Sequence, residues 1–131
     1  MTRQAVFPAE LAAIGAATGF SPAVRAGDFL FLTGATGGDA DGQMPPDADT
    51  QVRSALTKAL SVITAAGGDT DSIVEITSYH TQLRADFDVI DAALREVLGL
   101  PLPAWTAVEV AGLRRAGAVV ELRIVAHLPG Q

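Results

Sequence analysis

The sequence predicts a single-domain α+β protein, a two-layer sandwich with two helices on one face of a mixed sheet. Three observations favour this class. The chain has 131 residues, of which 49% are apolar and 18% are charged, as is typical of one folded domain with one core. Two segments have the apolar spacing of amphipathic helices, and short β-rich segments surround them. We therefore expect one domain over residues 1–131 with the order β-β-α-β-α-β-β.

The first two strands are predicted to form a hairpin. Residues 20–25 and 29–33 are apolar segments on either side of the short turn Ala26-Gly27-Asp28. A glycine-containing turn between two such segments is typical of a hairpin. The next stretch, residues 34–49, is rich in glycine, aspartate and proline. These residue types predict a surface loop.

The first helix is predicted after this loop, where apolar residues recur with the i, i+3, i+4, i+7 spacing of one helix face. The pattern runs from Val52 to Ala66. We expect Asp49 or Thr50 to cap the start of this helix, and Gly67-Gly68 to end it.

The second helix is predicted to begin at Asp86, because aspartate is a favourable N-cap residue. Phe87 then starts a second series of apolar residues on one helix face, and this series runs to Leu98. Gly99 and Pro101 follow. Both residue types favour the end of a helix at this point.

Three further strands are predicted over residues 72–79, 104–110 and 118–128, which are short β-rich segments. Side chains alternate between the two faces of a strand. In the last strand, one face is wholly apolar, whereas the other carries Val119, Glu121, Arg123, Val125 and His127. The mixed polarity of this second set predicts a surface that meets another subunit or lines a wet cleft.

Charge and composition exclude several classes of function. The net charge is −6 and the pI is near 4.6, which argues against a nucleic-acid partner, because phosphate binding requires clustered lysine and arginine. The single basic pair, Arg114-Arg115, does not change this. No apolar stretch has the length of a membrane span and the N-terminus lacks a signal-peptide pattern, so we expect a cytoplasmic protein without a membrane partner. The chain has no cysteine, which excludes disulfides and thiolate chemistry.

No metal site or nucleotide-binding loop is predicted. His80 and His127 lack the spacing of metal ligands and have no acidic cluster nearby, so we expect them at strand ends. Residues 33–38 are glycine-rich, but they lack the Gly-Lys-Ser/Thr ending of a phosphate loop. Residues 39–42 lack the later ligands and the closing glutamate of a calcium loop. We therefore expect a flexible loop followed by a turn.

Four segments of the chain form a characteristic series. Residues 19–34 read Gly-Phe-Ser-Pro-Ala-Val-Arg-Ala-Gly-Asp-Phe-Leu-Phe-Leu-Thr-Gly, and residues 103–113 read Pro-Ala-Trp-Thr-Ala-Val-Glu-Val-Ala-Gly-Leu. Residues 119–122 follow as Val-Val-Glu-Leu, and Ala65-Ala66-Gly67-Gly68 ends the first helix. Together these segments resemble the Rid (reactive intermediate deaminase, YjgF-like) family. The resemblance covers nearly the whole chain from Gly19 onward.

This resemblance implies a chorismate-mutase-like fold assembled as a homotrimer, with a small-molecule cleft at each subunit interface. The best-known family members hydrolyse enamines and imines, such as 2-aminoacrylate, to a ketone and ammonia without a metal or cofactor. In those proteins, an arginine in a Pro-Ala-Arg motif binds the substrate carboxylate, and a glutamate near the chain end positions the attacking water. We accordingly expect no cofactor and no metal.

The resemblance also implies roles for particular residues. Glu121 matches the water-positioning glutamate, and Ala107 matches the position whose backbone faces the substrate. Thr33 stands where the family often has serine, and it keeps a hydroxyl. Phe20 stands where tyrosine is frequent, and Phe87 is expected to form an apolar wall of the cleft. The alternative to a water-positioning role is a structural one, in which Glu121 is a charged residue on a strand that pairs at a subunit edge.

Trp105 occupies the position of the family's substrate-binding arginine. An indole has one N–H donor and no charge, so it cannot bind a carboxylate as a guanidinium does. One interpretation is that Trp105 forms an aromatic floor suited to a flatter or less charged ligand. The other is that it fills the cleft or stabilises the trimer. Arg123 restores a cation only if its side chain reaches the same cleft.

Two hypotheses about function remain open. The first is a cofactor-free hydrolase of Rid type that acts on an imine, enamine or related small intermediate, with Glu121 positioning water. The second is a non-catalytic small-molecule binding or accessory protein that has lost deaminase activity. RNA cleavage is the least favoured reading, because the chain is acidic and has no basic stripe.

Overall fold

The computed structural model describes residues 3–130, apart from the side chains of residues 10 and 12–14. One mixed sheet has the strand order β1-β2-β3-β7-β5-β6, with the short β4 paired to β7. The β5–β6 pair is parallel and the others are antiparallel. The strands are β1 (Gln4–Val6), β2 (Ala23–Ala26), β3 (Phe29–Leu32), β4 (Ala35–Thr36), β5 (Ile73–His80), β6 (Ala104–Glu109) and β7 (Val120–His127).

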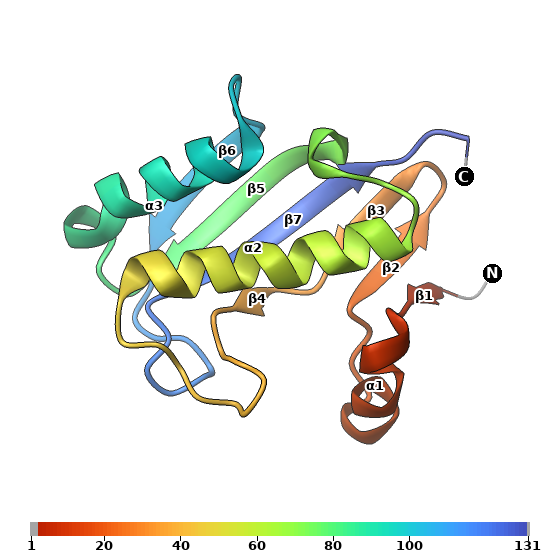
Figure 1. Cartoon of the computed structure of the whole chain (residues 1–131), viewed down its shortest axis with the longest axis horizontal. Coiled ribbons are helices and arrows are strands. Elements are labelled where there is room, and N and C mark those ends of the chain that lie inside the picture. The colour runs from red at the N-terminus through yellow and green to blue at the C-terminus, as the bar shows by residue number, and fades with distance from the viewer. Residues whose placement is uncertain (1–2, 131) are drawn as a thin grey trace.

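Two long helices cover one face of the sheet (Figure 1). The helix α2 (Ala48–Ala65) crosses the strands, and α3 (Leu83–Leu98) packs against α2 and next to β6. The short α1 (Ala12–Thr18) follows the 3-10 turn η1 (Ala9–Leu11) at the β1–β2 end of the sheet, and η2 (Thr70–Ser72) precedes β5. The predicted two-layer α+β class is therefore confirmed. No helix in the described part of the chain is long and apolar enough to cross a membrane.

Besides the 3-10 turns η1 and η2, the structure adds two strands and one α-helix to the predicted order. The strand β1 has three residues and α1 has seven, and neither segment carries an extended periodic pattern. The strand β4 has two residues and lies within the predicted loop. It exists because Ala35 pairs with Leu122 and Thr36 pairs with Glu121 on β7. Such elements depend on tertiary pairing, which local sequence does not encode.

Both predicted helix caps are corrected by the structure. The N-cap of α2 is Asp47, whose side chain accepts a hydrogen bond from the Thr50 N–H at 2.9 Å. Neither Asp49 nor Thr50 is the cap. The helix α3 begins at Leu83 rather than after Asp86, which lies within its first turn.

The early start of α3 has a tertiary cause. Its N-cap residue, Gln82, makes no side-chain capping bond. Instead, the Leu83 N–H donates to Glu109 Oε1 of β6 at 3.0 Å. A carboxylate from a distant strand thus satisfies a backbone donor that a local cap would otherwise serve.

The predicted alternation of β7 is confirmed. Its apolar side chains are buried beneath the helices, namely Val120, Leu122, Ile124 and Ala126. The opposite face of the sheet has no helix over it (Figure 1). On β3 this open face leaves Phe29 and Phe31 42% and 41% exposed. The two histidines lie at the ends of β5 and β7, as expected.

Candidate functional site

Glu121 lies between two cavities. It is half-buried on β7 and borders a first cavity of about 420 Å³ and a second of about 410 Å³. Thr33 also borders both. The first cavity extends toward α2, and the second lies on the open face beside Tyr79 of β5. The carboxylate is therefore reachable from two sides.

A break in strand pairing opens this space. The strand β3 pairs with β7 through Phe31 and Val125, and pairing resumes on β4 with Ala35 and Leu122. The backbone of Thr33-Gly34 leaves β7 between these points. A Cβ atom on Gly34 would lie 2.6 Å from Glu121 Oε2. Glycine at this position therefore leaves room for the carboxylate.

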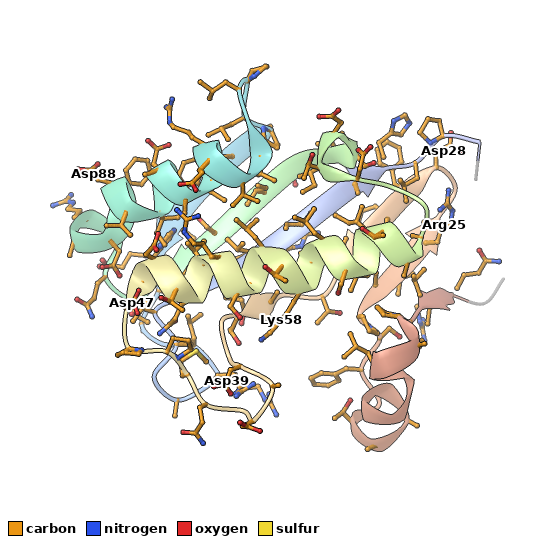
Figure 2. The ribbon with its side chains drawn as sticks, in the orientation of Figure 1. Arg25, Asp28, Asp39, Asp47, Lys58 and Asp88 are labelled. Carbon is orange, nitrogen blue, oxygen red and sulfur yellow. The ribbon has the colours of Figure 1, made fainter. Side chains whose placement is uncertain are left out.

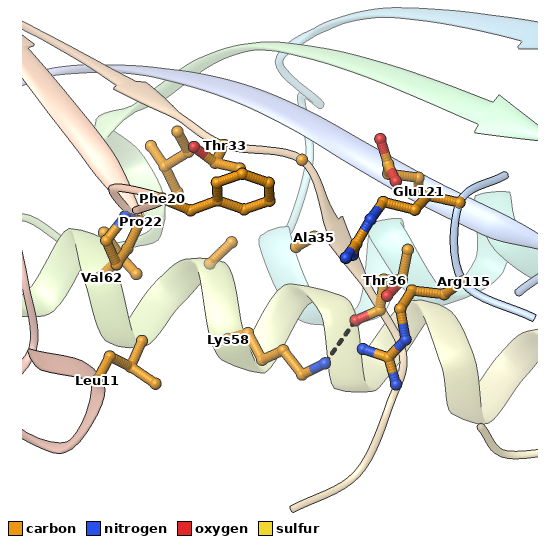
Figure 3. A pocket seen from close by; sticks show the side chains of 14 residues that line it. Leu11, Phe20, Pro22, Thr33, Ala35, Thr36, Lys58, Val62, Arg115 and Glu121 are labelled. Atoms are coloured by element: carbon orange, nitrogen blue, oxygen red, sulfur yellow. Dashed lines mark hydrogen bonds between the residues drawn. The ribbon is translucent and has the colours of Figure 1, made fainter. Parts of the chain in front are cut away.

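Two predicted site residues accompany Glu121 in the first cavity. Figure 3 shows Phe20, Thr33 and Glu121 around it. The Thr33 hydroxyl donates to the Ser21 carbonyl at 2.6 Å, so its proton is used there and its oxygen lone pairs stay available as acceptors. Phe20 is 58% exposed, and the Arg114 guanidinium carbon lies 5.8 Å from its ring centroid.

The first cavity also contains three cations that sequence reasoning did not place there, Lys58, Arg114 and Arg115. Lys58 lies midway along α2, on the side facing β4 (Figure 2), and donates to the Thr36 carbonyl at 2.8 Å. Burial lowers the pKa of Lys58; the charge of Arg115 adds to this, and Asp39 opposes it. The basic pair was visible in the sequence, but its proximity to Lys58 was not.

Gln51 holds the segment that carries the two arginines. This side chain is fully buried on α2. Its Nε2 donates to the carbonyls of Pro45 at 2.7 Å and Gly117 at 3.0 Å, and its Oε1 accepts from the Val119 N–H at 2.9 Å. Arg115 also donates to the Gly42 carbonyl at 3.0 Å. These bonds join the loop before α2 to the loop before β7.

The remaining predicted residues form a second cluster. The rings of Trp105 and Phe87 stack with centroids 5.1 Å apart and an interplanar angle of 5°. Trp105 Nε1 donates to Ser78 Oγ at 2.8 Å, and Ser78 Oγ lies 2.6 Å from His80 Nε2. Ser78 and His80 are fully buried. The only N–H of the indole is thus used within the protomer.

His80 is held in a largely apolar environment. Burial lowers its pKa, and the charge of Asp86 acts in the opposite direction. Its Nδ1 has no hydrogen-bond partner among the described atoms. A neutral imidazole is the form that such a site favours, and it supports Ser78 beneath the indole.

The strand register separates the two clusters. Trp105 and Ala107 on β6 pair with the buried Ile76 and Ser78, so they lie on the helix-covered face. Glu121 pairs with Tyr79, which lies on the opposite face of β5. Within one protomer, the structure brings Phe20, Thr33 and Glu121 together, whereas Phe87, Trp105 and Ala107 form a separate cluster.

Arg123 borders the second cavity together with Glu121 and Tyr79. It also lies 3.8 Å from Glu75 Oε1 in a solvent-exposed ion pair. The side chain therefore reaches the surroundings of Glu121, and its charge is partly balanced there.

The family described as Endoribonuclease L-PSP matches residues 10–128 of this chain. The RutC family protein YjgH of Escherichia coli K12 is 38% identical over 130 residues, which cover 98% of each chain. The chain belongs to this Rid/YjgF-like family. The predicted resemblance is thereby confirmed.

Solved structures of this Rid/YjgF-like family share the fold. A structure of protein YjgH has a TM-score of 0.88 at 38% identity and covers 100% of both chains. RidA from the Antarctic bacterium Psychrobacter sp. PAMC 21119 has a TM-score of 0.79 at 26% identity, covering 98% of this chain and 97% of that chain. The chorismate-mutase-like arrangement expected of a Rid/YjgF-like protein is confirmed by these neighbours.

Proposed function

We propose that this protein is a cofactor-free hydrolase of imines, enamines or related small reactive intermediates, in which Glu121 positions the attacking water. Membership of the Rid/YjgF-like family supports a role in processing small molecules. The single observation that carries the proposal is the place of Glu121, whose carboxylate lies between two cavities next to Gly34.

The chemistry needs one carboxylate and one water. Glu121 accepts a proton from the water as the water oxygen attacks the carbon of the protonated imine, which gives a carbinolamine. Glu121 then passes that proton to the nitrogen. As the C–N bond breaks, Glu121 accepts the proton of the carbinolamine hydroxyl, and a ketone and ammonia leave. A positioned general base typically contributes about 10²–10⁴-fold to such a step. No redox partner is required, because the oxidation state of the substrate carbon does not change.

We further propose that the working site lies between protomers of a homotrimer. The open face exposes Phe29, Phe31 and Val108, the last 37% exposed, and exposed apolar side chains on one face favour association. In such an assembly, Phe87 and Trp105 of a neighbouring protomer supply an aromatic wall, and the backbone of Ala107 faces the ligand. Phe20, Thr33 and Glu121 come from the first protomer.

The proposal is tested by ammonia release from a panel of freshly generated imines. The wild type is expected to exceed the spontaneous hydrolysis rate, and Glu121→Gln is expected to lower kcat/KM by about 100-fold or more. Glu109→Gln would be a poor control, because Glu109 Oε1 caps α3. Glu96→Gln, an exposed position on α3, is the matched control. Equal rates for wild type and Glu121→Gln would remove the proposed role of Glu121.

A second candidate is a non-catalytic small-molecule binding or accessory protein. The inward hydrogen bond of Trp105 favours it, because this residue replaces the family's arginine and is tied into its own protomer. It predicts ligand-induced thermal stabilisation without turnover, since a ligand that binds only the native state raises the melting temperature.

We also propose that the protein is cytoplasmic and has no membrane partner. A nucleic-acid partner is not expected, given the net charge of −6. An RNA incubated with thoroughly purified protein is expected to stay intact, and cleavage that co-purifies with the folded protein would contradict this.

A further inference from the structure

The first cavity has more positive charge than its single carboxylate balances. Lys58, Arg114 and Arg115 border it, against Glu121 alone. This excess is notable in a chain whose net charge is −6. A concave surface with one sign of charge raises the local concentration of oppositely charged ligands.

Arg114 is the cation best placed to bind a ligand. Its guanidinium contacts the face of Phe20. The ion pairs among the described side chains involve Arg53, Arg95 and Arg123, and none involves Arg114. The ring contact restrains the guanidinium without using its five N–H donors, whose planar fork matches a carboxylate.

Lys58 is a second source of positive charge at the same cavity. Its ammonium group has three donors, and one of them is used by the Thr36 carbonyl (Figure 3). Both burial and the nearby Arg115 disfavour its charged form, and Asp39 offsets this in part. An anion bound between Lys58 and Arg114 would stabilise that charged form.

The position of Arg114 is set before a ligand arrives. The loop that carries it is joined to α2 by the buried Gln51, through the Gly117 carbonyl and the Val119 N–H. Its neighbour Arg115 is bonded to the Gly42 carbonyl. A preorganised cation loses less entropy on binding than a mobile one.

We infer that the first cavity is an anion site, in which Arg114 is the principal ligand, and Lys58 the second, for the carboxylate of a small organic acid. The cation that Trp105 does not provide then comes from the loop between β6 and β7. This inference rests on the proposed function in one respect, namely that the bound acid lies beside Glu121 as a substrate. Binding of a carboxylate at Arg114 can be measured without turnover.

The test is calorimetric titration with two probes of nearly equal shape, benzoate and the neutral benzamide, and with inorganic phosphate. The wild type is expected to bind benzoate more tightly than benzamide or phosphate. Arg114→Gln is expected to weaken benzoate binding by about 10-fold or more, because charge-assisted hydrogen bonds to the carboxylate are lost, and to leave benzamide binding unchanged. The matched control is Arg84→Gln, an exposed arginine on α3, which is expected to bind benzoate as the wild type does.

Three results would overturn the inference. The first is that wild type and Arg114→Gln bind benzoate equally well. The second is that the wild type binds benzoate and benzamide equally well. The third is that phosphate binds as tightly as benzoate, with the same dependence on Arg114. If Arg114→Gln shows a lowered melting temperature, Lys58→Met is titrated in its place, and unchanged benzoate affinity there also counts against the site.

Glu121→Gln separates this inference from the proposed function. The variant removes a negative charge from the cavity, so it is expected to keep benzoate binding or to strengthen it. Absence of imine turnover in the wild type, together with intact Arg114-dependent benzoate binding, would contradict the hydrolase and leave the anion site standing. Imine turnover in the wild type, without Arg114-dependent benzoate binding, would contradict the anion site alone.

Discussion

Gly34 sets the position of the Glu121 carboxylate, because any Cβ at residue 34 would meet Oε2 at 2.6 Å. The atom displaced is the end of a flexible side chain rather than backbone. A substitution here is therefore expected to displace the Glu121 carboxylate with little change to the backbone. Trp105 shows the opposite case, since its hydrogen bond to Ser78 and its stacking on Phe87 tie it to the interior of its own protomer.

Gly34→Ala is expected to keep the wild-type melting temperature within a few degrees and to lower kcat for imine hydrolysis about 10-fold or more, because Glu121 is displaced. The double variant Gly34→Ala/Glu121→Gln tests whether the effect acts through Glu121. If it does, the double variant is no slower than Glu121→Gln alone. Additive losses would show that Gly34 acts independently.

His80 is expected to make stability depend on pH. Its pKa is lowered in the folded state by burial, so below the unfolded-state pKa of about 6.5 the unfolded chain binds more protons than the folded one. The free energy of unfolding therefore falls as the pH drops through that value toward the folded-state pKa. Urea titrations at several pH values, for wild type and His80→Gln, measure this, and the variant is expected to show a shallower slope. Identical slopes would contradict the assignment.

At the level of elements, the long periodic segments were predictable and the short ones were not. The helix α2 and the alternation of β7 follow from apolar spacing that local physics encodes. The start of α3 could not be predicted in this way, because Glu109 on β6 satisfies the first backbone donor of the helix. Likewise, Phe20, Thr33 and Glu121 were predicted through family resemblance, whereas Lys58 and Arg114 join them only through the folding of α2 and the last loop.

Gln51 is expected to be the main polar support of the site. Gln51→Leu leaves the Pro45 and Gly117 carbonyls and the Val119 N–H without their buried partner. The free energy of unfolding should fall by roughly 3 kcal/mol, since each buried polar group left unpaired costs about 1–3 kcal/mol. Urea denaturation measures this loss. Gln43→Leu, at an exposed loop position, serves as the control and should change stability by less than about 0.5 kcal/mol.

At the level of the whole molecule, one protomer separates the residues that the family resemblance assigns to one cleft. The Glu121 cluster borders two cavities, and the Trp105 cluster lies on the helix-covered face of the sheet. An open face with exposed Phe29 and Phe31 is suited to bury a neighbouring protomer. A closed ring of three protomers would give three equivalent contacts between unlike surfaces.

The most direct test of a site shared between protomers is a mixture of two chains, each altered in one of the two clusters. Glu121→Gln and Trp105→Leu are co-expressed and purified as mixed oligomers, and imine hydrolysis is compared with that of each variant alone. If neighbouring protomers contribute the two clusters, random mixing restores both wild-type clusters at about one site in four. Co-expression of Glu121→Gln with the double variant is the control and restores none. We expect activity well above the mean of the two single variants, and activity equal to that mean would contradict a site shared between protomers.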